Sequence, residues 1–192
     1  RRAIEILNYL QSSSSGLSLA SISRDLSIPK STALRVLKEL SDGGYVHSDP
    51  ETGKYSLGPR LLTLSHAVRQ QSGLLKTALP HLERLSEEVG ETVKLTILQG
   101  KEVIVLYYIK GSSKMQISTD VGNQLPLHAG AASKVLLSSL SDLEIREFAS
   151  AGLKRYTDST ITDTSALIAA IHEVRERGFA VDDQEYMSGV AA

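Results

Sequence analysis

The stretch 19–57 constrains the fold more than any other, because helix signals and turn signals follow one another there at short intervals. Ser18 belongs to the residue types that cap helix N-termini. Three apolar residues follow it at helical spacing, namely Leu19, Ile22 and Leu26. Pro29 disfavours helical backbone at the residue before it, so a second helix is expected to begin at or just after Pro29. The pattern therefore predicts two short helices joined by a tight turn.

The second of these helices is expected to have two faces of opposite character. Its apolar face comprises Ala33, Leu34, Leu37 and Leu40, and its polar face comprises Ser31, Arg35, Lys38 and Asp42. Hydroxyl groups and cations on one face suit a helix lying in a DNA major groove, where they reach base edges and phosphates. The predicted DNA-contacting residues on this helix are Lys30, Ser31, Thr32, Arg35 and Lys38.

A β-hairpin is expected directly after this helix. Gly43-Gly44 supplies the residue type that a helix end with positive φ requires. Two β-prone runs at 45–48 and 54–57 flank a turn at 49–53 that contains Pro, Asp and Gly. This order of elements predicts a winged helix-turn-helix, with Lys54 on the wing as a further DNA contact. The alternative is that the same elements only pack together and have no DNA partner.

Composition argues for a globular protein of two small domains and against a membrane protein. The 192 residues are 41% hydrophobic and 22% charged, as in soluble globular chains with room for two small domains. No apolar run approaches the roughly 20 residues that cross a bilayer, and no cysteine is present, so we expect a cytoplasmic protein with no membrane partner. Residues 1–60 hold 8 basic and 6 acidic residues, and residues 61–192 hold 13 and 16. DNA affinity would therefore depend on a few placed cations and on pairing two such domains in an oligomer.

Helix and strand patterns alternate over the rest of the chain. Helices are expected at 1–10, 60–71, about 79–90, about 130–140, from Ser141, and from Asp163 or Thr164 to Gly178. Strands are expected at 93–97, 103–109, 115–117 and 179–181. The inward residues are expected to be Ala3, Ile4, Leu7 and Leu10 in the first helix, and Leu167, Ile168, Ile171 and Val174 in the last. Helices mixed with antiparallel-looking strands predict an α+β fold.

These patterns divide the chain into three parts. Residues 1–58 form the predicted winged helix-turn-helix domain, and residues 59–73 form a linker helix. The linker helix has a single apolar stripe, which is typical of a connector that also makes a dimer contact. Residues 74–192 form a second α+β domain.

Two segments of the second domain carry groups that could bind a small molecule. Small residues at 129–132 open a helix, where free backbone N–H groups and the positive end of the helix dipole favour a carboxylate. The same residues could instead allow close packing of the helix on a sheet. Asp182, Asp183 and Glu185 could hydrogen-bond a ligand, or could form a solvated turn. The histidines lack metal-ligand spacing and no nucleophile lies beside a base, so we expect no metal, cofactor or enzymatic activity.

The chain resembles transcriptional regulators of the IclR family over essentially all of its length. In the first domain the resemblance rests on the runs 28–35, 37–40, 44–46 and 55–58. In the second domain it rests on Leu125–Ala129 followed by Ala132 and Lys134, and on Gly178-Phe179 ahead of Asp182-Asp183 and Glu185.

The resemblance implies an N-terminal winged helix-turn-helix, a linker helix and a C-terminal effector-binding domain with a GAF/profilin-like fold. It implies a homodimer or homotetramer that represses or activates transcription from a double-stranded DNA operator in response to a small organic or aromatic acid. The effector-binding residues it implies are Leu125, Ala131, Ala132, Asp182, Val190 and Ala192. Family members often have Cys at the last of these positions, so Ala192 removes a polar contact.

The family continues through further strands and a closing helix, so the effector-binding domain is expected to be incomplete at its C-terminus. The alternative function is a metabolite-binding module or small-molecule enzyme that uses the helix-turn-helix as an interaction surface.

Overall fold

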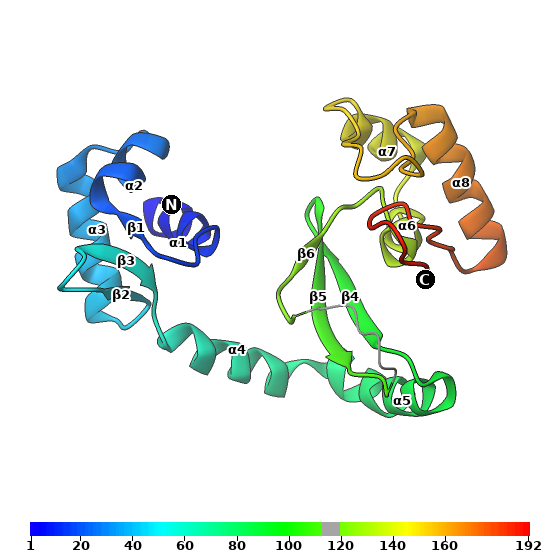
Figure 1. Ribbon diagram of the computed structural model, residues 1–192, viewed down its shortest axis with the longest axis horizontal. Helices are drawn as coiled ribbons and strands as arrows, with labels where there is room; N and C mark the ends of the chain where they lie inside the picture. Colours follow the sequence, from blue (N-terminus) through cyan, green and yellow to red (C-terminus); the bar gives the residue numbers. More distant parts are fainter. Residues whose placement is uncertain (113–119) are drawn as a thin grey trace. The chain divides into compact units, whose positions relative to one another are not determined.

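The chain folds into two compact units, Arg1–Ser72 and Gly73–Ala192, in a computed structural model that describes residues 1–112 and 120–192 (Figure 1). The first unit contains α1 (Arg2–Gln11), β1 (Leu17–Ser18), α2 (Leu19–Asp25), α3 (Lys30–Asp42), β2 (Val46–Ser48), β3 (Lys54–Leu57) and α4 (Arg60–Gln71). The second contains α5 (Gly73–Val89), β4 (Val93–Gln99), β5 (Glu102–Ile109), β6 (Gln124–Leu125), α6 (Ala131–Leu137), α7 (Asp142–Ala149) and α8 (Thr164–Arg177). Each unit combines helices with an antiparallel sheet, which confirms the predicted α+β class.

The helix-turn-helix forms where the sequence predicts it. The Ser18 hydroxyl accepts the Ser21 N–H at the start of α2, and α3 begins at Lys30 directly after Pro29. Between the two helices Ser27 adopts a left-handed conformation, with φ of 53°. This single residue turns the chain sharply enough for α2 and α3 to pack against each other.

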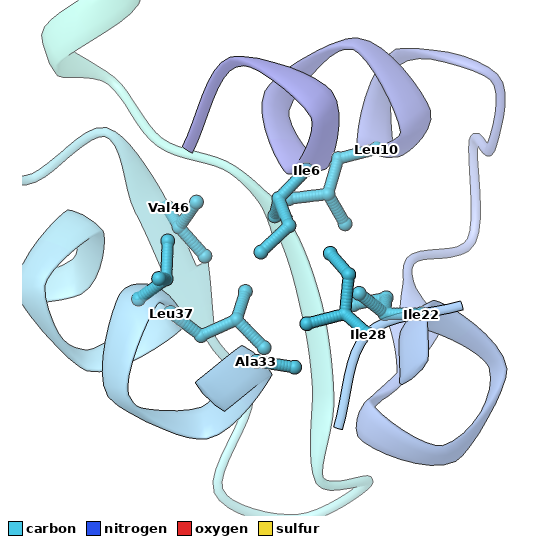
Figure 2. Close-up of a cluster of buried hydrophobic side chains, with 8 residues drawn as sticks. Ile6, Leu10, Ile22, Ile28, Ala33, Leu37 and Val46 are labelled. Atoms are coloured by element: carbon cyan, nitrogen blue, oxygen red, sulfur yellow. The ribbon is translucent and has the colours of Figure 1, made fainter. Parts of the chain in front are cut away.

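The core of the first unit is entirely apolar and joins α1, α2, α3 and β2 (Figure 2). The fully or nearly fully buried side chains are Ile6, Leu10, Ile22, Ile28, Ala33, Val36, Leu37 and Val46. Two of the residues predicted to face this core are exposed instead, Ile4 by 63% and Leu34 by 49%. In α1 the buried pair lies four residues apart, and Ile4 projects to another side of the helix. In α3 the apolar stripe follows i, i+3, i+4 and i+7 spacing from Ala33, so Val36 faces the core and Leu34 does not.

The predicted hairpin is present and gains a third strand. β2 and β3 pair antiparallel, with Val46 opposite Leu57, and β1 pairs with the other edge of β3. The sequence pattern did not predict β1, which is only two residues long. Gly44, with φ of 74°, takes the positive φ after α3, whereas Gly43 keeps a right-handed conformation.

The helix α4 has the predicted bounds and buries none of its side chains. Three of its apolar residues, Leu62, Leu64 and Val68, are exposed. Leu64 and Val68, one turn apart, share a side of the helix with the half-buried Leu61 and leave an apolar stripe open to solvent, whereas Leu62 projects from another side.

The sheet of the second unit has the order β4-β5-β6, with β5 in the centre. A register shift between Leu95 and Thr96 interrupts the β4–β5 ladder, and α5 packs against both strands. The sequence pattern did not predict the short strand β6. The strand expected at 115–117 lies outside the described residues.

The helices α6, α7 and α8 enclose the core of the second unit together with β5 and the residues after β6. All four residues predicted to face inward from α8 are buried: Leu167, Ile168, Ile171 and Val174. Ser141 and Glu144 form the capping box of α7, Asp163 caps α8, and Gly178 ends α8 with φ of 76°. The helix α6 ends at Leu137 rather than near residue 140.

The strand predicted at 179–181 is absent. Phe179 and Val181 are each 56% exposed, and the stretch joins no ladder within the described part of the chain. Backbone pairing begins only at Asp182, which exchanges hydrogen bonds with Ala192. Apolar character alone does not make a strand, because a strand also needs a partner for its backbone. None of the helices among the described residues has both the length and the hydropathy required to cross a membrane.

Candidate DNA-contacting and ligand-binding sites

The polar face of α3 is open to solvent. Of the six predicted DNA-contacting residues, Thr32 is half-buried and the others are exposed: Lys30, Ser31, Arg35, Lys38 and Lys54. The Arg35 guanidinium lies 3.2 Å from the Glu39 carboxylate, and the two side chains are 70% and 64% exposed. Such an exposed pair contributes little free energy, so the guanidinium can leave Glu39 for another anion at small cost. The structure thus presents hydroxyls and cations on a helix whose opposite face is sealed in the core.

The turn of the wing is held by one carboxylate. The Asp49 side chain accepts the Thr52 hydroxyl at 2.5 Å and the Glu51 N–H at 2.9 Å. These hydrogen bonds, that of Thr52 first, lower the pKa of Asp49 and keep it ionised. The Asp49 N–H donates to the Lys54 carbonyl, which fixes the backbone of Lys54 at the base of this turn.

A polar contact between α1 and α2 was missed by the sequence pattern. The Tyr9 hydroxyl and the Arg24 guanidinium both donate to the Asp25 carboxylate, at 2.5 and 2.7 Å. The hydrogen bond from Arg24, followed by that from Tyr9, lowers the pKa of Asp25. Because Tyr9 is sixteen residues away along the chain, local spacing carries no signal for this contact. The contact ties α2 to α1 on the outside of the core.

Five of the six predicted effector-binding residues lie in the first turn of α6 or in residues 182–192, the C-terminal turn, which contacts Gly130 before α6. Ala131 and Ala132 form the first turn of α6, after Gly130, whose backbone φ is 101°. Asp182 is buried, and its carboxylate lies so close to Gly130 that a Cβ there would sit 3.6 Å from Oδ2. Ala192 exchanges two backbone hydrogen bonds with Asp182, of 2.6 and 3.0 Å. The carbonyl of Val190 accepts the Gln184 N–H at 3.0 Å.

Leu125 lies elsewhere in this unit. It is half-buried on β6 and pairs with Val103 of β5. It lines a groove, and none of the other five predicted effector-binding residues is among the described residues that line this groove. The structure therefore brings together residues of α6 and of the C-terminal turn, without Leu125.

A buried ion pair underlies this cluster. The Lys134 ammonium contacts the Glu185 carboxylate and donates to the Val181 carbonyl at 2.6 Å, and both charged residues are at least nine-tenths buried. The other Glu185 oxygen accepts the Gly130 N–H at 3.3 Å. The sequence pattern singled out both residues but not their pairing, because they are 51 residues apart.

The ion pair also determines what Asp182 can bind. Lys134 is neutralised by Glu185, and within the described residues no cation forms a salt bridge with Asp182. One Asp182 oxygen, Oδ1, accepts the Glu185 N–H at 2.8 Å. The other oxygen faces the start of α6, where it can accept a hydrogen bond from a ligand hydroxyl. In the described part of the chain, no group of three or more His, Asp or Glu side chains could hold a metal ion.

Two family models match this chain. The model described as "IclR helix-turn-helix domain" matches residues 1–50, and the model described as "Bacterial transcriptional regulator IclR C-terminal" matches residues 66–192. Among curated proteins, the HTH-type transcriptional repressor AllR of Escherichia coli strain K12 is 32% identical over 190 residues, which are 98% of this chain and 70% of AllR.

Solved structures agree with these matches. An IclR transcriptional regulator from Alicyclobacillus acidocaldarius is 30% identical and superposes with a TM-score of 0.86 over 99% of this chain and 77% of its own. An IclR homologue from Microbacterium hydrocarbonoxydans, solved in complex with 4-hydroxybenzoate, is 26% identical, with a TM-score of 0.78 over 99% of this chain and 79% of its own. The helix-turn-helix, the wing and both family matches lead to one conclusion: this chain belongs to the IclR family of bacterial regulators and is a DNA-binding regulator of transcription.

Proposed function

We propose that this regulator reads its operator with the polar face of α3 and with the wing. The observation that carries the proposal is the contrast between the two sides of α3, where Ala33 and Leu37 are sealed while Ser31, Arg35 and Lys38 are exposed. Ser31 and Arg35 suit base edges in a major groove, and Lys38 suits a phosphate. The full set of proposed contacts is Lys30, Ser31, Thr32, Arg35, Lys38 and Lys54.

The regulator acts as a homodimer or homotetramer in this proposal. One winged helix with so small an excess of positive charge binds DNA weakly, and pairing two of them on neighbouring half-sites adds their contacts. Support comes from the exposed stripe on α4, where Leu64 and Val68, one turn apart, are 40% and 58% exposed. A second copy could cover such a stripe.

The effector in this proposal is a small organic acid that also carries a hydroxyl group. Its carboxylate would accept the free N–H groups of Ala131 and Ala132, at the positive end of the α6 dipole. Its hydroxyl would donate to Asp182, which repels a second negative charge but accepts a hydrogen bond. The 4-hydroxybenzoate bound by the Microbacterium homologue is a compound of this class and supports the proposal. Val190 and Ala192 would complete the wall beside Asp182, and Leu125, which lines a separate groove, is left out of the proposed site.

The test starts from the full-length protein and does not require the operator sequence to be known. Binding sites are selected from random double-stranded DNA, and the affinity for the selected site is measured by fluorescence anisotropy. A thermal-shift screen of small carboxylic and hydroxycarboxylic acids then identifies ligands, which are titrated into the protein–DNA complex. We expect at least one hydroxycarboxylic acid to raise the Tm and to change the Kd for DNA. Selection of no preferred sequence, or a DNA affinity that no acid changes, would overturn the proposal.

Asp182→Asn tests the ligand-binding part by itself. Because the amide keeps the shape of the side chain but removes its charge, we expect the effector Kd to rise roughly tenfold, as for one charge-assisted hydrogen bond lost. The DNA affinity of the ligand-free protein should not change. Asp183→Asn is the matched control, because Asp183 is the exposed neighbour of Asp182. Equal effector affinities for wild type and Asp182→Asn would remove Asp182 from the site.

The proposal includes no catalytic step. Incubation of the protein with the same panel of acids should therefore leave each compound chemically unchanged, as chromatography of the mixtures would show. A regulator of this kind acts on DNA in the bacterial cytoplasm.

A further inference from the structure

A groove on the second unit, which includes Leu125, takes no part in the proposed effector site. It lies between the β5–β6 end of the sheet and the segment 148–156. Its walls combine aromatic and charged side chains, among them His128, Phe148, Lys154, Tyr156 and Tyr186. Such a mixture of ring surfaces with a few placed polar groups is typical of small-molecule sites.

The state of His128 can be derived from its one hydrogen bond. Its Nε2 atom lies 2.8 Å from the backbone carbonyl oxygen of Lys154. A carbonyl oxygen only accepts, so Nε2 must carry the proton. In the neutral ring Nδ1 therefore holds an unshared electron pair and acts as an acceptor. Because a backbone carbonyl cannot donate a hydrogen bond, this contact requires the Nε2–H tautomer of the neutral ring.

The acceptor on His128 has no partner of its own. Although the residue is only 4% exposed, no group in the described part of the chain hydrogen-bonds Nδ1. The single side-chain atom of the described residues that is both fully buried and unpartnered is Ser41 Oγ, so Nδ1 keeps some contact with solvent. His128 lines the groove, so a molecule in the groove lies beside its ring.

Aromatic rings surround this acceptor. The His128 ring lies 6.3 Å from the Phe148 ring and 5.7 Å from the Tyr156 ring, both tilted, and Tyr186 meets Tyr156 edge-on at 5.2 Å. The Lys154 ammonium sits 5.0 Å from the centre of the Tyr156 ring. A flat ring that enters the groove would find edges and faces to pack against, and its polar group would meet the His128 acceptor.

We propose that this groove is a second small-molecule site, which binds a phenol through a hydrogen bond from the phenol O–H to His128 Nδ1. The ligand class follows from two requirements: an aromatic ring to pack against Phe148 and Tyr156, and a donor to satisfy a neutral imidazole acceptor. The site does not depend on the proposed effector site, because it shares neither Asp182 nor the start of α6.

The test compares phenol with anisole on the full chain. The two molecules have similar rings, but the methoxy group of anisole cannot donate a hydrogen bond. Isothermal titration should show phenol binding about three- to tenfold more tightly, which is the range for one neutral hydrogen bond. In the same samples, long-range ¹H–¹⁵N spectra of the histidine rings should show the His128 Nε2–H tautomer, and phenol should shift the His128 Nδ1 resonance while anisole leaves it unchanged.

Variants locate the site. His128→Phe keeps a ring of similar size but removes Nδ1, so phenol should lose its advantage over anisole. His81→Phe is the matched control, because His81 is an exposed histidine on α5 outside the groove. Asp182→Asn should leave phenol binding unchanged even though the proposed effector site depends on Asp182. This last variant separates failure of the effector proposal from failure of the groove proposal.

Three results would overturn the groove proposal. One is equal affinity of the wild-type protein for phenol and anisole, and another is no binding of either. The third is a phenol-induced change centred on Ala131 and Asp182, with His128 unaffected. The spectra of the wild-type protein decide the question even if His128→Phe fails to fold.

Discussion

The two units of the chain bury different kinds of side chains. In the first unit, which is described throughout, the buried residues form one apolar cluster and no polar residue is buried as a whole, although one hydroxyl oxygen, Ser41 Oγ, is covered. In the second unit the buried set includes Lys134, Asp182 and Glu185, together with His128. A surface that reads DNA needs only a rigid apolar support behind exposed polar groups. A pocket that encloses a polar ligand must bring polar groups inside, where each one requires a partner.

The largest expected effect tests this contrast in the second unit. Lys134→Met removes the cation and leaves the Glu185 carboxylate buried without a charge partner, which should lower the free energy of unfolding by about 3–5 kcal/mol. Urea unfolding followed by circular dichroism measures the loss, and hydrogen–deuterium exchange assigns it to the second unit. Arg84→Met is the control, because Arg84 pairs with Glu88 at 3.8 Å on the surface, with side chains 72% and 65% exposed.

A second substitution in the same background sharpens the result. Adding Glu185→Leu to Lys134→Met removes the orphaned charge, so the double variant should recover part of the lost stability. If the single variant loses no more than the Arg84→Met control, the buried ion pair does not hold α6 to the C-terminal turn.

The next effect tests the apolar core of the first unit. Ile6→Ala deletes a fully buried side chain and should lower the free energy of unfolding by about 2–5 kcal/mol through lost burial and the cavity left behind. Ile4→Ala, two residues earlier and 63% exposed, should change it by less than about 0.5 kcal/mol. The same urea experiment applies. Equal losses at the two positions would show that α1 does not turn Ile6 inward and Ile4 outward.

A smaller effect concerns function in the first unit. Arg35→Ala should cost roughly 1–3 kcal/mol of operator binding if the guanidinium reads a base. Anisotropy titrations on the selected operator and on random DNA measure this loss. Lys38→Ala is the comparison, because a phosphate contact weakens binding to both DNAs alike. An equal loss on both DNAs for Arg35→Ala would assign Arg35 to a phosphate, and stability should be unaltered because Arg35 is exposed.

Local chemistry explains why so much of the fold could be predicted from the sequence. Ser18, Ser141 and Asp163 each cap a helix through an N–H group three residues ahead, and Gly178 ends a helix by its own backbone conformation. These signals lie within four residues of their effect. The helix-turn-helix and the wing are built from such signals, and for that reason the first unit could be predicted almost completely.

The incorrect predictions concern features that depend on residues far apart in the sequence. Ile4 was predicted to be buried, and 179–181 to be a strand, from apolar character alone, although burial and pairing depend on partners far along the chain. The pairing of Lys134 with Glu185 carries no local signal, because such contacts are decided by tertiary packing. Individual residues of the candidate ligand site could therefore be proposed from the sequence, but the ion pair beside them could not.

The smallest effect compares the same backbone strain in the two units. Ser27 and Gln184 both adopt left-handed backbone, with φ of 53° and 59°. No hydrogen bond of the Ser27 side chain exists within the described residues, so Ser27→Gly should relieve strain and raise the free energy of unfolding by about 0.5 kcal/mol. In contrast, the Gln184 side-chain oxygen accepts the Gly189 N–H at 2.9 Å. Gln184→Gly loses that bond of about 1 kcal/mol and should show no gain, whereas equal gains for the two variants would mean that the hydrogen bond between Gln184 and Gly189 adds no stability.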